Sequence, residues 1–428
     1  MSHDENVIAW QLDNGLQVLL RPVFYAPVAS CWIWYRVGSR NELPGQTGIS
    51  HWVEHMMFKG TPTFPKGNIM RTVNKFGGTL NGFTSQDYTA YYETLPADHL
   101  DLALRIEADR MANSVFDPDE VESERTVIIS ERQGNENSPT FLLGEELSAL
   151  AFRCHPYGHQ IIGSKEDLLR LNRDELWQHY RRYYGPHNAV LVIGGAVQEE
   201  TARSLVEKFF GPIPPGEAPP PVLAVEPPQL GERRVTITRP GTAQYFQAAF
   251  HVPAGQHPES LALAVLDAML SGSSGLAMGA GSTPTHRSAR LYRALVETNL
   301  ATRASSSSGL SIDPGLFRFG ATVRDGRELA EVESAIWDEI HRLQDEPVSS
   351  QELLRAQKQA RAQFAYALES VTNQAMWLGM WEMVDSHRRV FTTLDQLAAV
   401  TADQVQHVAQ TYLVPYNRSV GWFVPTEG

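Results

Sequence analysis

The chain has few of the features that mark exported, disulfide-rich or membrane proteins. It has only two cysteines, Cys31 and Cys154, in 428 residues, so a disulfide framework is excluded by count and a bond between these two is not expected. No stretch approaches the roughly 18 apolar residues of a membrane-spanning helix. Residues 1–6 lack the basic and apolar runs of an export signal. We therefore expect a cytoplasmic protein.

Basic charge is also scarce. The chain has 49 acidic residues against 36 lysines and arginines, which gives a formal net charge of −13. A protein that binds the phosphates of a nucleic acid needs a basic surface, so we do not expect nucleic acid as a partner. Because no long apolar run is present, we do not expect a membrane either. The acidic balance is compatible with simple solubility and with a preference for basic peptides.

Length and composition indicate a globular protein with more than one domain. A chain of 428 residues is longer than a domain with a single hydrophobic core usually is. Its content of 42% hydrophobic residues is typical of globular proteins. A proline-rich stretch at 214–230 is typical of an extended linker. It separates an N-terminal domain, 1–213, from a C-terminal domain, 231–428.

The two halves carry one pattern twice. Leu168, Asp174, Tyr183, Pro186 and Asn188 precede an apolar run, and 229 positions later the same order appears as Leu397, Asp403, Tyr412, Pro415 and Asn417. Such self-similarity predicts that one domain is a copy of the other. Short β-branched runs, such as 235–238 and 245–251, alternate with long helical patterns, such as 350–368. This alternation predicts an α+β fold with a mainly antiparallel sheet in each domain.

The most informative motif is His51-Trp52-Val53-Glu54-His55. Residues four apart share one face of a helix, so His51 and His55 can offer ring nitrogens to one metal ion at roughly 2.0–2.1 Å. Glu54 lies beside them and can act as general base on a metal-bound water. Two histidines at this spacing also occur on ordinary surfaces and in cores. The motif therefore requires a third ligand.

With so few cysteines, the third ligand must be a carboxylate or another histidine, since a catalytic zinc site has three protein ligands and one open position. Asp117 is a typical N-cap, Pro118 a typical first helical residue, and Glu120 the third-position residue of a capping box. The helix that they begin would carry Glu124 and Glu131 two turns apart on one face. These two carboxylates are either a solvated acidic stripe or a metal ligand with a helper.

The order of these residues resembles the pitrilysin/insulinase family of inverzincin zinc metallopeptidases, in particular the metal-bearing subunits of its processing-peptidase branch. The resemblance implies that His51, His55 and Glu131 bind Zn²⁺, that Glu54 is the catalytic base and that Glu124 supports the site. It also implies two homologous domains that face each other across a chamber. Further segments share the resemblance, at 13–20, 38–42, 48–50 and 77–91.

By the same resemblance, the segment at 77–91 contains an edge strand to which the substrate adds as a further strand. Backbone groups around Asn81 and Gly82 would then bind the peptide. Such binding depends more on the backbone of the substrate than on its side chains, so it favours extended peptides. The resemblance thus predicts a zinc-dependent endopeptidase.

One part of the C-terminal domain departs from the family pattern. Family members carry there an arginine and, seven residues on, a tyrosine that hold the substrate, whereas this chain has Val296 and Thr302. Neither side chain offers a guanidinium or a phenol to a developing oxyanion, and Tyr292, Arg293 or Arg303 would replace them only by a shift of register. We therefore expect a metal-bearing subunit that is completed by a homologous chain with the Arg/Tyr pair, with a homodimer as the other possible assembly. The alternative is a non-catalytic structural or assembly subunit of the same fold.

Overall fold

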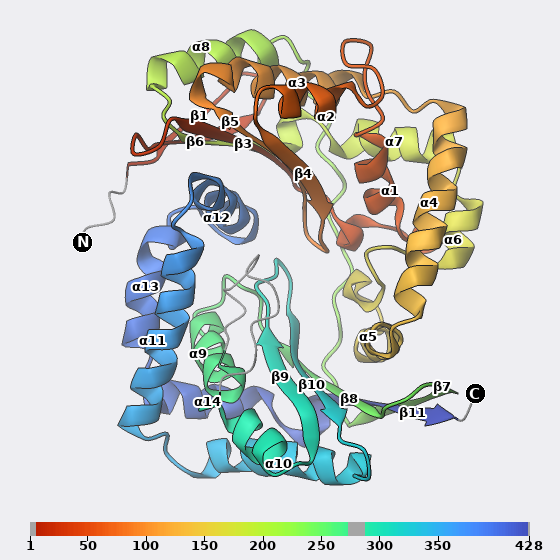
Figure 1. The fold of residues 1–428 in the computed structure, drawn as a ribbon, viewed down its shortest axis with the longest axis vertical. Coiled ribbons are helices and arrows are strands. Elements are labelled where there is room, and N and C mark those ends of the chain that lie inside the picture. Colours follow the sequence, from red (N-terminus) through yellow and green to blue (C-terminus); the bar gives the residue numbers. More distant parts are fainter. Residues whose placement is uncertain (1–5, 273–286, 427–428) are drawn as a thin grey trace. The chain divides into compact units, whose positions relative to one another are not determined.

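The structure, a computed structural model, describes residues 6–272 and 287–426. The chain forms two compact units (Figure 1). Unit 1 is built from the segment up to Gln133, from His159–Ala224 and from Leu368–Phe391, and unit 2 from Gly134–Gly158, from Val225–Ala367 and from the segment after Phe391. Each unit therefore includes a short segment from the other half of the sequence. The predicted continuous domains, 1–213 and 231–428, differ from the units by this exchange.

Unit 1 contains a six-stranded sheet in the order β1-β2-β6-β3-β5-β4. β2 and β6 are parallel, and the other neighbouring strands are antiparallel. The strands are β1 (Ile8–Gln11), β2 (Gln17–Pro22), β3 (Val28–Tyr35), β4 (Thr79–Thr84), β5 (Thr89–Pro96) and β6 (Ala189–Gly195). β3 and β6 are buried along nearly their whole length, as their continuous apolar runs indicate. β4 is an edge strand, as predicted for the segment around Asn81.

Helices cover both faces of this sheet, with α3 and α8 on one face and α12 on the other (Figure 1). The helices of unit 1 are α1 (Ile49–Met56), α2 (Asn68–Lys75), α3 (Leu100–Asn113), α4 (Pro118–Glu136), α6 (Lys165–Arg170), α7 (Arg173–Tyr183), α8 (Glu199–Phe210) and α12 (Val371–Val384), with short 3₁₀ turns η1 (Ser39–Asn41), η2 (Ala97–His99) and η4 (Pro186–Asn188). α4 continues for three residues beyond the segment assigned to unit 1.

Helix α12 comes from the C-terminal half of the sequence and packs on β3 and β6. Small residues allow the close approach. A β-carbon on Gly379 would overlap the indole of the buried Trp34, and a β-carbon on Gly194 would lie 3.3 Å from that of Ala375. Larger side chains at the two glycines would push the helix off the sheet.

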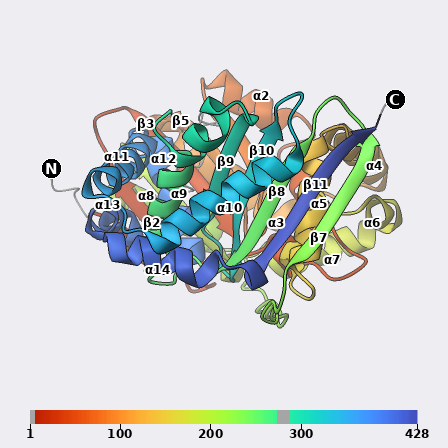
Figure 2. The ribbon, with the colours of Figure 1, turned by 90° about the horizontal axis from the view of Figure 1, so that it is seen from below.

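Unit 2 contains a five-stranded sheet in the order β7-β11-β8-β10-β9, whose strands lie side by side in Figure 2. β7 and β11 are parallel, and the other neighbouring strands are antiparallel. The strands are β7 (Arg233–Pro240), β8 (Tyr245–Val252), β9 (Ala301–Ser308), β10 (Gly315–Val323) and β11 (Arg418–Thr426). The helices are α5 (Pro139–Ala151), α9 (Ser260–Ser271), α10 (Leu329–Asp345), α11 (Ser350–Ala367), α13 (Arg389–Ala399) and α14 (Ala402–Tyr412), with η3 (Pro156–Gly158), the π-helical η5 (Tyr292–Glu297) and η6 (Pro415–Asn417).

The two sheets share one topology. The order β2-β6-β3-β5-β4 in unit 1 matches β7-β11-β8-β10-β9 in unit 2, including the single parallel pair. The repeated asparagine also makes the same bond in each unit, since Asn188 Nδ2 donates to the carbonyl of Tyr183 at 2.9 Å and Asn417 Nδ2 to that of Tyr412 at 2.8 Å. The predicted α+β fold of two homologous domains is therefore confirmed, while the chamber between them stays a prediction.

Several local predictions can be checked directly. The helix expected from Pro118 is α4, and Asp117 Oδ1 accepts the backbone N–H of Asp119 at 2.9 Å, as expected of an N-cap. The predicted capping box is wrong, because the side chain of Glu120 does not bond the backbone N–H of Asp117. Its Oε1 lies 2.6 Å from Lys66 Nζ, and its Oε2 has no hydrogen-bond partner in the described part of the chain. Both cysteines are free thiols. Among the described residues, no helix has the length and apolarity to cross a membrane.

Candidate metal centre

Helix α1 and helix α4 bring three potential metal ligands together in unit 1. His51 and His55 lie one turn apart on α1, and the Nε2 atoms of their rings lie 3.9 Å and 3.8 Å from Glu131 Oε2 on α4. One ligand atom from each residue fits within a separation of 4.8 Å. Two ligands at roughly 2.1 Å from a tetrahedral zinc ion lie about 3.4 Å apart. The two distances to Glu131 Oε2 are therefore within about half an ångström of the spacing that a shared zinc ion requires.

Glu124, the predicted helper, holds the His55 ring. Its Oε1 lies 2.8 Å from His55 Nδ1, which leaves His55 Nε2 facing Glu131. Its other oxygen forms an ion pair with Lys59. Burial alone would raise the pKa of Glu124, but the bonds to His55 and Lys59 outweigh burial and hold the pKa below its ordinary value. Carboxylates that orient metal-binding histidines in this way fix the ring and its tautomer.

The two histidines differ in their electrostatics. Burial lowers the pKa of His51 to about 3, and the neighbouring His55 adds to this effect, so His51 is neutral and able to bind a metal. Burial also acts to lower the pKa of His55, but the bond to Glu124 and the charge of Glu54 outweigh it and raise the pKa above its ordinary value. His51 Nδ1 is buried without a hydrogen-bond partner in the described part of the chain.

Glu54 lies beside the three ligands and is almost fully buried, with 7% exposed. Its Oε2 accepts a hydrogen bond from Thr84 Oγ1 at 2.7 Å. Burial raises the pKa of Glu54 despite this bond. A cavity of about 340 Å³ opens next to it and is lined by Glu54, His55, Phe58, Lys59, Lys66, Gly67 and Glu124. The roles of Thr84 and Lys59 were not predicted from the sequence, because they depend on tertiary contacts with Glu54 and Glu124.

The two predicted substrate-binding residues lie on the edge strand β4. Gly82 is paired in register with Tyr91 of β5, and its own backbone N–H donates to Asn81 Oδ1 at 2.9 Å. A β-carbon on Gly82 would lie 2.7 Å from the ring of Tyr91 and 3.1 Å from that of Phe58, so the position must remain glycine. The structure thus places Asn81 and Gly82 where a further strand can add to the sheet.

The residues that depart from the family pattern lie in unit 2. Val296 is half-buried in η5, and Thr302 is exposed at the start of β9. Thr302 Oγ1 donates to the carbonyl of Thr322 at 3.4 Å. Neither side chain carries the guanidinium or the phenol that the family places there.

Comparison with known proteins agrees with the site. The family description "Insulinase (Peptidase family M16)" matches residues 17–165, which include the complete ligand set, and "Peptidase M16 inactive domain" matches residues 170–360. The chain belongs to peptidase family M16. The pitrilysin/insulinase resemblance predicted from the sequence is therefore confirmed.

Relatives in the M16 family extend along almost the whole chain. An uncharacterized zinc protease of Bacillus subtilis is 28% identical over 400 residues and covers 93% of each chain. A probable mitochondrial-processing peptidase subunit beta of Arabidopsis thaliana is 27% identical over 406 residues, which is 94% of this chain and 75% of that one. The crystal structure of a protease from Helicobacter pylori superposes with a TM-score of 0.92 at 26% identity, over 98% of this chain and 100% of that one.

Proposed function

We propose that this chain is a zinc-dependent endopeptidase, or the metal-bearing subunit of one, with His51, His55 and Glu131 as the zinc ligands. The convergence of these three side chains beside the buried Glu54 carries the proposal. Two imidazoles and one carboxylate are a donor set that suits zinc. The M16 relatives whose names describe them as zinc proteases support the same metal.

The chain's own residues account for the proton transfers. When bound, Zn²⁺ supplies Lewis acidity that polarises the scissile carbonyl and acidifies water. Glu54, whose carboxylate is oriented by the hydroxyl of Thr84, accepts the proton of the attacking water and passes it to the leaving amine. The raised pKa of Glu54 suits a group that must both accept and release a proton near neutral pH. Glu124 keeps the His55 ring in its metal-binding orientation.

The substrate is an extended peptide that adds to the edge strand β4. In this arrangement backbone groups near Asn81 and Gly82 hold the peptide beside Glu54, to which β4 is tied through Thr84. Because strand addition uses backbone groups, sequence preference is expected to be broad and folded proteins are expected to be poor substrates.

The departure at Val296 and Thr302 supports a two-chain enzyme. A homologous chain that carries the Arg/Tyr pair would supply donors for the developing oxyanion, whose absence costs about 10²–10³ in rate. A second copy of this chain has the same Val296 and Thr302 and would not supply them. The Arabidopsis relative is named as a subunit. A cytoplasmic location stays a prediction. The non-catalytic alternative is less well supported, because the base and all three ligands are present and lie together.

The test is to purify the chain, measure its bound metal, and assay cleavage of unstructured fluorogenic peptides with and without a homologous chain that carries the Arg/Tyr pair. We expect bound zinc, weak cleavage by the chain alone and a rise of about 10²–10³ in the mixture. Equal activity with and without the second chain would refute the two-chain part. A chain without zinc and without cleavage in every mixture would instead be the non-catalytic subunit.

A further inference from the structure

We propose that Glu42 is a positioning residue, which fixes the first turn of helix α1 and thereby aims His51 at the metal. The inference rests on the proposed function, since it concerns one of the zinc ligands proposed above. Glu42 lies outside the metal site and touches none of the four residues that hold the metal or act as base. Its effect is transmitted through the backbone of α1.

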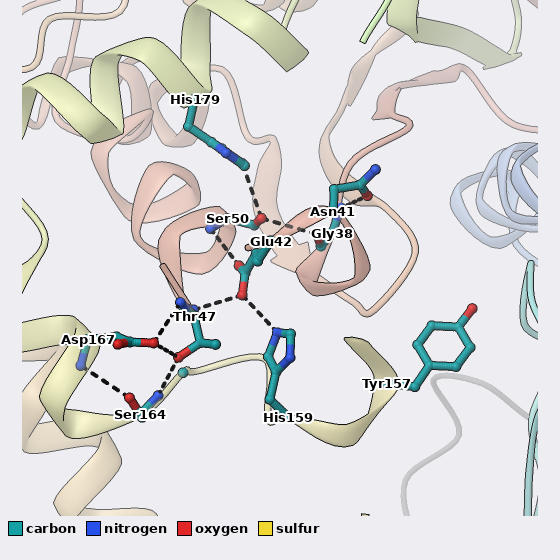
Figure 3. A network of polar contacts seen from close by, with 12 residues as sticks. Gly38, Asn41, Glu42, Thr47, Ser50, Tyr157, His159, Ser164, Asp167 and His179 are labelled. Carbon is teal, nitrogen blue, oxygen red and sulfur yellow. Dashed lines mark hydrogen bonds and ion pairs between the residues drawn. The ribbon is translucent and has the colours of Figure 1, made fainter. Parts of the chain in front are cut away.

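The carboxylate of Glu42 takes the place of a missing helix cap. Its side chain is fully buried, its Oε2 accepts the backbone N–H of Gly48 at 2.8 Å, and its Oε1 accepts that of Ser50 at 2.9 Å (Figure 3). Gly48 is the N-cap residue of α1 and has no side chain that could do this. The first N–H groups of a helix have no partner within the helix, and a carboxylate near them also interacts favourably with the helix dipole.

Gly48 cannot be replaced by a residue that caps the helix itself. Its φ of 88° lies in the left-handed region, and a β-carbon there would lie 2.5 Å from the carbonyl oxygen of Ile162. The usual serine, threonine or aspartate cap is therefore excluded at this position. The cap has to come from elsewhere in the chain, and Glu42 provides it.

Neighbouring groups hold Glu42 and the first turn in one arrangement. His159 Nε2 lies 3.0 Å from Glu42 Oε2, so that one oxygen serves both His159 and Gly48. Ser50 Oγ donates to the carbonyl of Gly38 at 3.2 Å and lies 3.2 Å from Nε2 of the buried His179 (Figure 3). The backbone and the side chain of Ser50 are thus both fixed, one residue before His51.

His51 depends on this cap more than His55 does. The ring of His55 is oriented by the carboxylate of Glu124, whereas Nδ1 of the His51 ring has no partner in the described part of the chain. The direction of His51 Nε2 toward Glu131 therefore follows from the backbone of the first helical turn. If that turn frays or rotates, His51 leaves the ligand set while His55 and Glu131 remain in place.

The same network supplies a matched control in Asp167. Its Oδ2 accepts the backbone N–H of Thr47 at 3.0 Å and the hydroxyl of Thr47 at 2.6 Å. It therefore bonds the residue directly before Gly48 but no N–H group of α1. Asp167→Asn and Glu42→Gln remove the same charge from the same neighbourhood, and only Glu42→Gln turns an amide donor toward the N–H groups at the helix start.

The experiment measures zinc affinity by competition with a chromophoric chelator, together with amide hydrogen exchange of the apoprotein. We expect Glu42→Gln to lower zinc affinity by about 10–100-fold and to speed exchange at Gly48 and Ser50. Asp167→Asn should change zinc affinity by less than about twofold, even where it lowers the melting temperature as much. Neither readout requires peptide cleavage.

The outcomes separate the inference from the proposed function. Unchanged zinc affinity in Glu42→Gln, or an equal loss in both variants, overturns the inference alone. A wild-type chain that binds no zinc overturns the proposed function and the inference with it. If Glu42→Gln does not fold, His159→Ala removes one contact of the carboxylate and should weaken zinc binding by about 2–10-fold; no change in that variant also overturns the inference.

Discussion

Helices α1 and α9 contact the edge strands of their own sheets, β4 in unit 1 and β9 in unit 2. Both helices carry a buried carboxylate that accepts a hydroxyl hydrogen bond from that strand. Glu54 on α1 accepts from Thr84 at 2.7 Å, and Asp267 on α9 accepts from Ser306 at 2.5 Å. The link between helix and edge strand is therefore common to both units, and by itself it is not a sign of catalysis.

The difference lies in what surrounds the carboxylate. Both oxygens of Asp267 are bonded, the second by the backbone N–H of Ser308 at 3.3 Å, and every residue of α9 is buried. Glu54 lines a cavity, and the half-buried His51 and His55 lie on the same helix. The comparison shows that the same helix-to-strand contact adjoins a candidate metal site in unit 1 and is enclosed by buried residues in unit 2.

Exchange of the two carboxylates for amides should give the largest difference between the units. Glu54→Gln should keep bound zinc but lower the turnover number by about 10²–10⁴, because no base remains for the attacking water. Asp267→Asn should leave the turnover number near that of the wild type and destabilise unit 2 by about 1–3 kcal/mol, because buried donors lose their acceptor. Turnover and zinc content of the complete enzyme are the measurements. Full activity of Glu54→Gln would refute its role as base.

Loss of the carboxylate behind His55 should give the next largest effect. Glu124→Gln should lower zinc affinity by about 10–100-fold, because the neutral amide loses the charge that strengthens the bond to His55 and the ion pair with Lys59. Glu122→Gln is the matched control on the same helix, since Glu122 is exposed and pairs with Arg125. Chelator competition measures both variants. Equal affinities of the two would show that Glu124 does not support the ligand.

Removal of the hydroxyl that ties the edge strand to the base should have a smaller effect. Thr84→Val should lower the turnover number about tenfold with little change in KM, because Glu54 loses a hydrogen bond that directs its carboxylate. Thr84→Ser should restore most of the rate. Ser306→Ala makes the corresponding change in unit 2 and should leave the rate unchanged. A Thr84→Val enzyme as fast as the wild type would show that the bond is only structural.

The smallest effect concerns the pH dependence of unit 1. Burial lowers the pKa of His179 in the folded state to about 3, against about 6.5 when the chain is unfolded. The unfolded state therefore binds more protons, and the stability from neutral His179 is fully present above pH 6.5 and lost as the pH falls toward 3. As the pH falls over this range, the free energy of unfolding should decrease less steeply in His179→Gln than in the wild type. The difference between the two slopes corresponds to the uptake of up to one proton on unfolding. Denaturant titrations at several pH values measure the slope, and identical slopes would contradict the buried neutral form.

Part of the candidate metal site could be predicted because local spacing determines it, whereas the choice of Glu131 as the third ligand came from the family resemblance and stays a prediction. Four residues place His51 and His55 on one helix face, and the Asp117 cap fixes the helix on which Glu131 follows Glu124 by two turns. The repeated turn with its asparagine could be predicted for the same reason, since each copy bonds a carbonyl five residues before it.

The remaining parts depend on contacts between residues that are far apart in the sequence. Thr84 reaches Glu54 only because β4 lies beside α1, and Glu120 leaves its expected capping box because Lys66 lies within reach of its carboxylate. The sequence pattern also did not predict that α5 belongs to unit 2 and α12 to unit 1. The proline-rich stretch marks a single boundary between the halves, and it carries no information on which sheet each helix covers.

The most direct test of the account is the zinc content of the purified chain, measured per chain for the wild type and for a folded His51→Ala, His55→Ala double variant. The account predicts one zinc in the wild type and none in the double variant, because only unit 1 assembles a ligand set among the described residues. Zinc retained by the double variant, or a wild type that binds none, would contradict it.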